Sequence, residues 1–141
     1  MKAISVRAPW WWWILYGQKD IENRGPYFPR TVTGRVWLHV GKWWIKDEID
    51  FDIEDAEAMH RKAHGCEGLL VPGDGWDSLR ESCGCIVGSV EIVEYVDHSE
   101  SPWFVGDIGI VLRNPIALDE PVPFRGMLGF FNVPDDLAGL K

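Results

Sequence analysis

Three charged residues with different chemistry lie close together in the segment GQKDIENR, residues 17–24. Lys19 can attract an anion or release a proton, and Glu22 can accept a proton or orient a hydrogen-bond donor. Arg24 can form paired hydrogen bonds with a phosphate, a carboxylate or the edge of a base. On an extended segment, Glu22 and Arg24 point to the same face, which Lys19 can reach from the preceding turn. We therefore predict a small polar pocket. The alternative is a solvated cluster of ion pairs, since charge runs usually lie at the surface.

His39 is a candidate proton donor or acceptor for this pocket, because histidine titrates near neutral pH. Together with Ser89 and Glu91 it supplies the residue types of a hydrolase triad. However, Ser89 follows Val87 and Gly88 in an apolar, β-branched segment, and no G-x-S-x-G turn is present to expose a nucleophile. We therefore interpret Ser89 as an ordinary serine in a sheet.

Histidines and cysteines in the middle of the chain have the residue types of a zinc site. His60 and His64 share one face of a predicted helix, Cys66 follows closely, and Cys83 and Cys85 come later. The C-x-C spacing is tighter than the usual C-x2-C spacing, and a small buried thiol is ordinary at the start of an apolar strand. We predict no metal and no cofactor, although the sequence leaves open whether His60, His64 and Cys66 bind a metal.

The segments on either side of residues 17–24 must position the pocket. Residues 1–7 alternate between apolar and polar and predict a strand. Pro9 suits the first turn of a helix and Gly17 suits its C-terminal cap, so a short helix should deliver Lys19 at its exit. Four consecutive tryptophans occupy this helix. We expect Trp10 and Trp13 in the core, and the places of the two tryptophans between them stay open.

The rest of the chain alternates between predicted strands and one long helix. We predict a strand at 34–40, with His39 on the face that forms a pocket wall. We also predict a helix at 47–64, an irregular segment at 66–84, and strands at 85–96, at 108–112 (ended by Asn114-Pro115) and at 126–133. This order predicts an α+β fold, a small and partly open β-barrel with flanking helices. The length of 141 residues suits one domain, residues 1–141.

Composition narrows the classes of function. The net charge of −8 argues against tight, non-specific binding to duplex nucleic acid, but not against a local basic patch. Nine tryptophans exceed what a core of this size needs, so some should form a surface or line a cavity where their rings stack on a flat ligand. Three cysteines form no disulfide framework, which favours a cytoplasmic location. The apolar run at 8–16 is too short to span a bilayer, so we expect no membrane association.

Several motifs in sequence order resemble the ASCH domain, a member of the PUA-like superfamily. The G-x-K-x-x-E-x-R signature of this family is complete, and the resemblance covers nearly the whole chain. The motifs are SVRAPW, GQKDIENR, WLHVGK, CIVGSVEIVE, SPWF, IGIVLRNP and RGMLGFFNV. The resemblance implies a small β-barrel with flanking helices and a cleft lined by the signature.

The resemblance also implies candidate ligand-binding residues. Residue matching gives Lys19, Glu22 and Arg24 from the signature, Arg7 and Trp10 from the opening motif, and His39 and Lys42 from the WLHVGK motif. Some ASCH-like amidohydrolases deacetylate N4-acetylcytidine with a lysine, a threonine and a glutamate. Lys19 matches that lysine, whereas Glu22 stands at the position of the threonine. Glu91 and Glu100 are the candidates for the third residue, and Glu91 is therefore also a candidate ligand-binding residue.

These observations lead to three hypotheses. The first is a nucleic-acid, nucleotide or nucleoside-binding domain, with RNA, single-stranded nucleic acid or a modified nucleoside as partner. The second is a small amidohydrolase acting on N4-acetylcytidine or a related nucleoside, with Lys19 and Glu22 as catalytic residues. The third is a ribonuclease or a protein-interaction domain. The sequence does not decide between RNA and DNA, and it does not give the oligomeric state.

Overall fold

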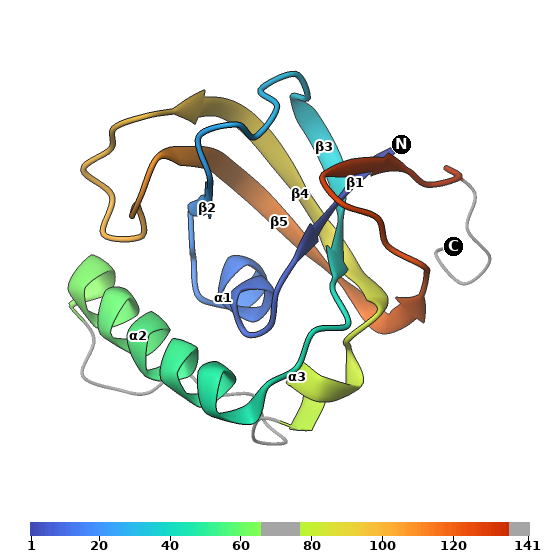
Figure 1. The fold of residues 1–141 in the computed structure, drawn as a ribbon, viewed down its shortest axis with the longest axis horizontal. Coiled ribbons are helices and arrows are strands. Elements are labelled where there is room, and N and C mark those ends of the chain that lie inside the picture. The colour runs from blue at the N-terminus through green and yellow to red at the C-terminus, as the bar shows by residue number, and fades with distance from the viewer. Residues whose placement is uncertain (66–76, 136–141) are drawn as a thin grey trace.

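The computed structural model describes residues 1–65 and 77–135. In these residues the chain forms six strands and three helices, which confirms the predicted α+β class (Figure 1). Their order is β1 (Lys2–Val6), α1 (Trp10–Tyr16), β2 (Ile21–Arg24), β3 (Gly34–Val40), α2 (Lys46–His64), α3 (Asp77–Glu81), β4 (Cys85–Val96), β5 (Ile108–Pro123) and β6 (Phe130–Asn132).

The strands form one mixed sheet in the order β2-β5-β4-β3-β1-β6. β1 and β3 are parallel, and the other neighbouring strands are antiparallel. The edge strand β2 is not hydrogen-bonded to β6 or to β1, so the sheet does not close into a barrel. The backbone of β2 nevertheless lies near that of β1, because the side chain of Arg24 reaches the Ser5 carbonyl. Because no ladder of hydrogen bonds joins β2 to β1, a space remains between these two strands, and the candidate site occupies it.

The main core lies between the sheet and the helices. Val36, Leu38 and Val40 are fully buried on the predicted face of β3, and α1 lies between the sheet and α2 (Figure 1). The tryptophans of α1 differ in part from the prediction. Trp13 is fully buried as expected, and the two open positions, Trp11 and Trp12, are buried too, whereas Trp10 is only half-buried. Trp10 begins the helix, where it faces the gap between β1 and β2.

The two longest elements show what the sequence predicted well and what it did not. α2 follows the prediction, with an acidic first turn, a basic last turn, and Gly65 as a left-handed cap at φ 65°. The prediction that Asn114-Pro115 ends a strand is wrong, because β5 continues to Pro123. Asn114 adopts a left-handed conformation at φ 53°, and the register of β4 and β5 shifts there. This bulge accommodates the proline without ending the strand.

One further element falls outside the predictions. The short helix α3 lies in the segment that the sequence indicated as irregular. No helix in residues 1–65 and 77–135 is long and apolar enough to cross a membrane.

Candidate functional site

The turn between α1 and β2 places Lys19 where the sequence predicted. Gly17 ends α1 beside the ring of Trp13, and a Cβ atom at Gly17 would lie 2.4 Å from that ring. Gln18 then adopts a left-handed conformation at φ 58°, which reverses the chain. The amides of Gly17 and Lys19 both donate to the Trp13 carbonyl, so the turn is tied to the helix end. The Lys19 side chain consequently enters the protein instead of pointing into water.

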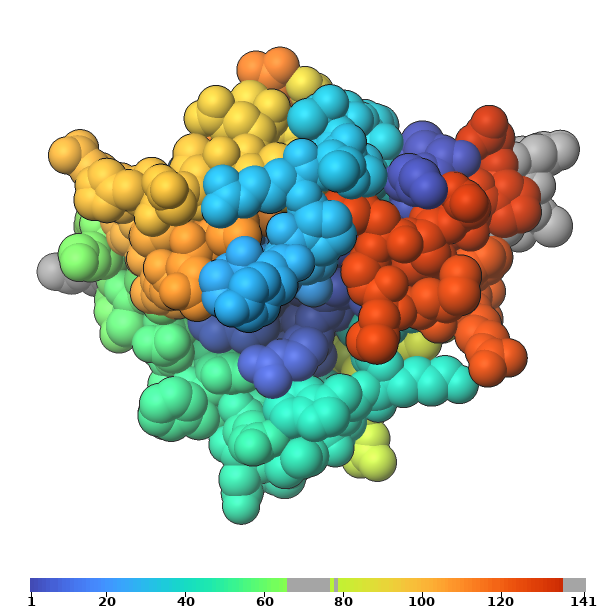
Figure 2. Space-filling model, turned by 45° about the horizontal axis from the view of Figure 1, so that its top comes forward, coloured from blue at the N-terminus to red at the C-terminus, as the bar shows by residue number. Residues whose placement is uncertain are grey.

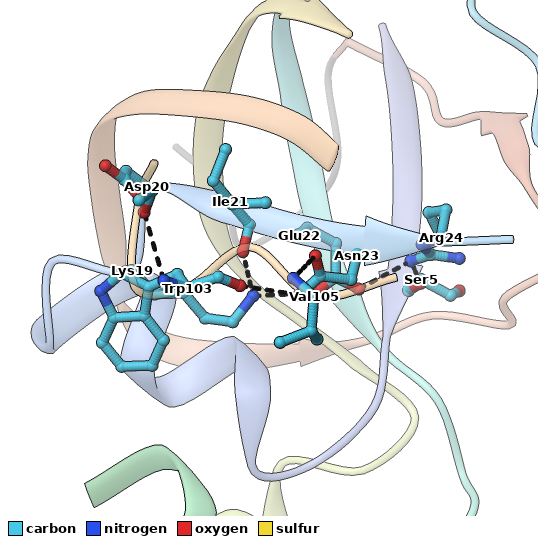
Figure 3. Close-up of polar contacts among 10 residues, drawn as sticks. Ser5, Lys19, Asp20, Ile21, Glu22, Asn23, Arg24, Trp103 and Val105 are labelled. Carbon is cyan, nitrogen blue, oxygen red and sulfur yellow. Dashed lines mark hydrogen bonds and ion pairs between the residues drawn. The ribbon is translucent and has the colours of Figure 1, made fainter. Parts of the chain in front are cut away.

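Lys19, Glu22 and Arg24 converge around the single carboxylate of Glu22 (Figure 3). Lys19 Nζ lies 3.2 Å from Glu22 Oε1 and also donates to the Ile21 carbonyl. Arg24 Nη2 lies 3.2 Å from Glu22 Oε2 and 2.6 Å from the Ser5 carbonyl oxygen. The carboxylate thus holds two cations, and Arg24 links β2 to β1. The pocket arrangement is realised, and the alternative of a solvated ion-pair cluster is not.

Burial separates this cluster from an ordinary surface ion pair. The side chains of Lys19 and Glu22 are 1% and 12% exposed, and that of Arg24 is 21% exposed. Burial lowers the pKa of Lys19 below its ordinary value, and the neighbouring Glu22 carboxylate opposes this shift. The Nε atom of Arg24 is buried and has no hydrogen-bond partner within the described ranges. A ligand or water molecule entering the site could satisfy this donor.

These residues line a cavity of about 390 Å³. The Trp10 ring lies over Lys19, with its centroid 5.5 Å from Nζ. Figure 2 shows a depression on this side, where blue residues from the start of the chain lie between the light-blue loop after β2, the green helix α2 and the red C-terminal segment. The cavity is lined by Ser5, Arg7, Trp10, Lys19, Glu22, Asn23, Arg24, Gly25, Asp55, Met59 and Val105.

The loop 99–107 forms one wall of the cavity because β2 holds it by side-chain hydrogen bonds (Figure 3). Asn23 Nδ2 donates to the Trp103 carbonyl oxygen at 2.9 Å, and Asn23 Oδ1 accepts from the Val105 amide at 2.9 Å. Asp20 accepts a hydrogen bond from Ser101 at 2.7 Å. Asn23 is a site residue that the sequence reasoning missed, although its place inside the signature segment was a usable signal.

Arg7 lines the cavity, the place that the resemblance implied for it. Its guanidinium lies 4.6 Å from the centroid of the Trp43 ring and 3.4 Å from a carboxylate oxygen of Asp52. Burial raises the pKa of that carboxyl, and Arg7 partly offsets the effect. Ser5 of β1 also lines the cavity. Asp55 and Met59 line it without an indication in the sequence, because α2 approaches the site only in the folded chain.

Three of the predicted ligand-binding residues do not line this cavity. His39 is buried, and it connects with the cavity only through Ser5, whose Oγ lies 2.9 Å from His39 Nδ1. Lys42 is exposed and lies beside Gly84. Glu91 pairs with Arg113 at 2.8 Å on the outer side of the sheet. Strand alternation gave the faces of His39 and Glu91, whereas the resemblance gave Lys42. The segment after Phe124 covers the His39 side chain, and the side chains of Lys42 and Glu91 lie at the surface, away from the cavity.

The metal hypothesis gains no support among the described residues. The rings of His60 and His64 lie 4.8 Å apart between centroids, but Cys66 falls outside the described ranges. Residues 1–65 and 77–135 hold no group of three potential ligands that could bind a metal ion. Cys83 and Cys85 are free thiols, and burial raises the pKa of both. Glu100, the other candidate for a catalytic glutamate, is exposed and does not line the cavity.

The buried histidines predict loss of stability in mild acid. His39 Nε2 donates to the Phe124 carbonyl at 2.7 Å, and burial lowers the pKa values of His39 and His60. Below the unfolded pKa near 6.5, the unfolded chain takes up protons that the native chain does not. The free energy of unfolding should therefore fall as pH decreases from 7.5 to 5.5 in urea titrations. A His39→Asn variant should show a flatter profile, and an unchanged slope would contradict this role.

Comparisons with known proteins give no assignment. No protein-family model matches the chain, and no curated protein matches it either.

Proposed function

We propose that the cavity binds a nucleobase with its attached sugar or phosphate, as the ligand-recognition site of an RNA-related ASCH domain with PUA-like architecture. The observation that carries the proposal is the convergence of Lys19 and Arg24 on one carboxylate beside the Trp10 ring. A cavity of about 390 Å³ lies at the small end of the range for small-molecule sites, which suits one nucleoside better than a larger ligand.

The charges and donors around the cavity match the parts of a nucleotide. Glu22 is acceptor-only when ionised, so its oxygens can accept hydrogen bonds from an amino or imino group of a base. The guanidinium of Arg24 can bond to a base edge or a phosphate, and Trp10 offers an aromatic face for stacking. Two cations around one carboxylate leave a net charge of +1 on this group of three side chains. That excess favours an anionic or electron-rich ligand.

Calorimetric titration with cytidine, uridine, adenosine and guanosine monophosphates tests this proposal. Arg24→Gln should weaken the best-bound nucleotide by about ten- to a hundredfold, the range for removal of a charged hydrogen bond. Arg113→Gln is the matched control, because Arg113 pairs with Glu91 at the surface in the same way that Arg24 pairs with Glu22. Equal affinities of the two variants would refute the pocket as the binding site.

The environment of Lys19 also favours a second candidate, the hydrolysis of an acylated exocyclic amine such as that of N4-acetylcytidine. A buried amine with a lowered pKa is neutral more often than an exposed one, and only the neutral amine can accept a proton or attack a carbonyl. Hydrolysis would add water across the amide to give acetate and cytidine. Purified protein should release acetate from N4-acetylcytidine, and the Lys19→Met substitution should abolish that release. If wild type and variant release equal amounts, this second candidate is excluded for that substrate.

A further inference from the structure

The opening of the cavity has two sides of opposite electrostatic character. On one side, α2 carries seven carboxylates against three lysine and arginine side chains, and its Asp55 lines the cavity. On the other side lie residues 25–30 and 124–129, which we call the acid-free rim because neither segment contains an aspartate or glutamate. In a chain of net charge −8, this separation directs any polyanion away from α2 and towards the rim.

The two parts of the acid-free rim lie side by side in the folded protein. Phe28 packs against Phe130, directly after the second segment, with ring centroids 5.4 Å apart. The guanidinium of Arg24 lies 4.9 Å from the Phe28 ring centroid, so the rim is joined directly to the cavity. Figure 2 shows the light-blue loop after β2 beside the red C-terminal segment, along one border of the depression.

The position of residues 124–129 depends on the close approach of the Gly126 backbone to the side chains of His39 and Ser5. A Cβ atom at Gly126 would lie 2.4 Å from a ring carbon of His39 and 3.0 Å from Ser5 Oγ. Any side chain there would displace the segment from His39 and Ser5. The chain between Phe124 and Phe130 is therefore seated on the outer face of β1 and β3, and its tip is held beside the cavity.

The acid-free rim presents apolar tips and free cations to solvent. Tyr27 is 97% exposed, Leu128 99% and Met127 60%, which leaves an aromatic ring and two aliphatic side chains uncovered. Arg30 and Arg125 are both exposed, and neither forms an ion pair with the described residues. Flat apolar surfaces between arginines are the features that hold a single-stranded nucleic acid, through base stacking and phosphate contacts.

We infer that the acid-free rim binds the nucleotides that flank the base in the cavity, so that the ligand is a single-stranded nucleic acid and not a free nucleoside. This inference rests on the proposed function, because the cavity sets the register of the strand. Arg30 and Arg125 contact phosphates, and Tyr27 stacks on a neighbouring base. The strand leaves the cavity over the rim, because the carboxylates of α2 repel its phosphates on the opposite side.

Fluorescence anisotropy with labelled RNA and DNA single strands of about eight nucleotides tests this inference, alongside the monophosphates used above. The strands should bind at least about tenfold more tightly than the best monophosphate. The double variant Arg30→Ser, Arg125→Ser should lose most of that gain and keep monophosphate binding. Its slope of log affinity against log salt should be flatter by about 1.4, for two lost phosphate contacts. Comparing the affinities of the RNA and DNA strands shows which of these two phosphodiester ligands the protein prefers.

The matched control is the double variant Arg61→Ser, Lys62→Ser, which removes two exposed cations from the last turn of α2, outside the acid-free rim. It should bind the strands as wild type does. The inference is overturned if the two double variants lose equal affinity, or if the strands bind no better than monophosphates. It is also overturned if the protein forms a dimer that Tyr27→Ser dissociates, since a second copy would then cover the rim. If Arg24→Gln loses nucleotide binding while Arg30→Ser, Arg125→Ser binds the strands as wild type does, the pocket proposal stands and the rim inference fails.

Discussion

Replacing Glu22 with alanine should lower the free energy of unfolding by about 3–5 kcal/mol, the range for removal of one partner of a buried ion pair. Glu22 is the only carboxylate within ion-pair distance of either Lys19 or Arg24 in the described part of the chain. Its loss leaves a buried ammonium and a mostly buried guanidinium facing each other without a counter-charge. Urea denaturation monitored by tryptophan fluorescence measures the change.

A surface carboxylate and a double variant make this test specific. Glu91→Ala removes the partner of Arg113 at a site where the arginine is 61% exposed, and it should cost no more than about 1 kcal/mol. Adding Lys19→Met to Glu22→Ala should recover part of the loss, because the uncompensated ammonium is then gone. If Glu22→Ala costs no more than Glu91→Ala, the charges of the cluster are solvated and the cavity does not enclose them.

Replacing Trp13 with alanine should cost about 3–5 kcal/mol, as large-to-small changes of buried aromatic residues do. Trp13 is fully buried, and its ring lies near the rings of Trp12, His60 and Trp103, at centroid distances of 5.1, 5.5 and 6.2 Å. The side chain therefore joins α1 to α2 and to the loop 99–107. The free energy of unfolding, measured by urea denaturation followed by circular dichroism, reports the cost.

The same substitution should also affect the candidate site. Trp103 belongs to the loop that Asn23 holds against the cavity, so a void at Trp13 loosens one wall. Nucleotide affinity should fall even at temperatures where the variant is folded. Phe51→Ala provides the control, because that aromatic side chain is 68% exposed on α2 and its loss should change stability by less than about 0.5 kcal/mol. Equal effects of the two substitutions would show that Trp13 is not a central packing residue.

Local sequence rules were sufficient for much of the fold. Pro9 and Gly17 bounded α1, and the charge gradient with Gly65 bounded the end of α2. These features act within a few residues, because caps, turns and strand alternation depend on neighbouring backbone groups. The same rules failed at Asn114-Pro115, where pairing of β5 with the long strand β4 outweighed the local tendency to end the strand.

Local rules also gave the charged residues of the site but not its boundaries. The spacing of Lys19, Glu22 and Arg24 predicted a shared pocket, and the structure brings all three together. Alternation placed His39 on the correct face of β3, but it did not show that the segment after Phe124 covers that face. The loop wall held by Asn23 also depends on hydrogen bonds between residues 80 and 82 positions apart in the chain.

The sequence by itself determined which side chains carry the chemistry, where α1 ends, and that Lys19 follows it at a turn. Only the tertiary structure decided that these charges are buried around a cavity and that Arg24 crosses to Ser5 in the gap between β2 and β1. The physical reason is that periodicity depends on adjacent residues. Burial depends instead on which distant segment covers a given face, and that is settled by the packing of the whole chain.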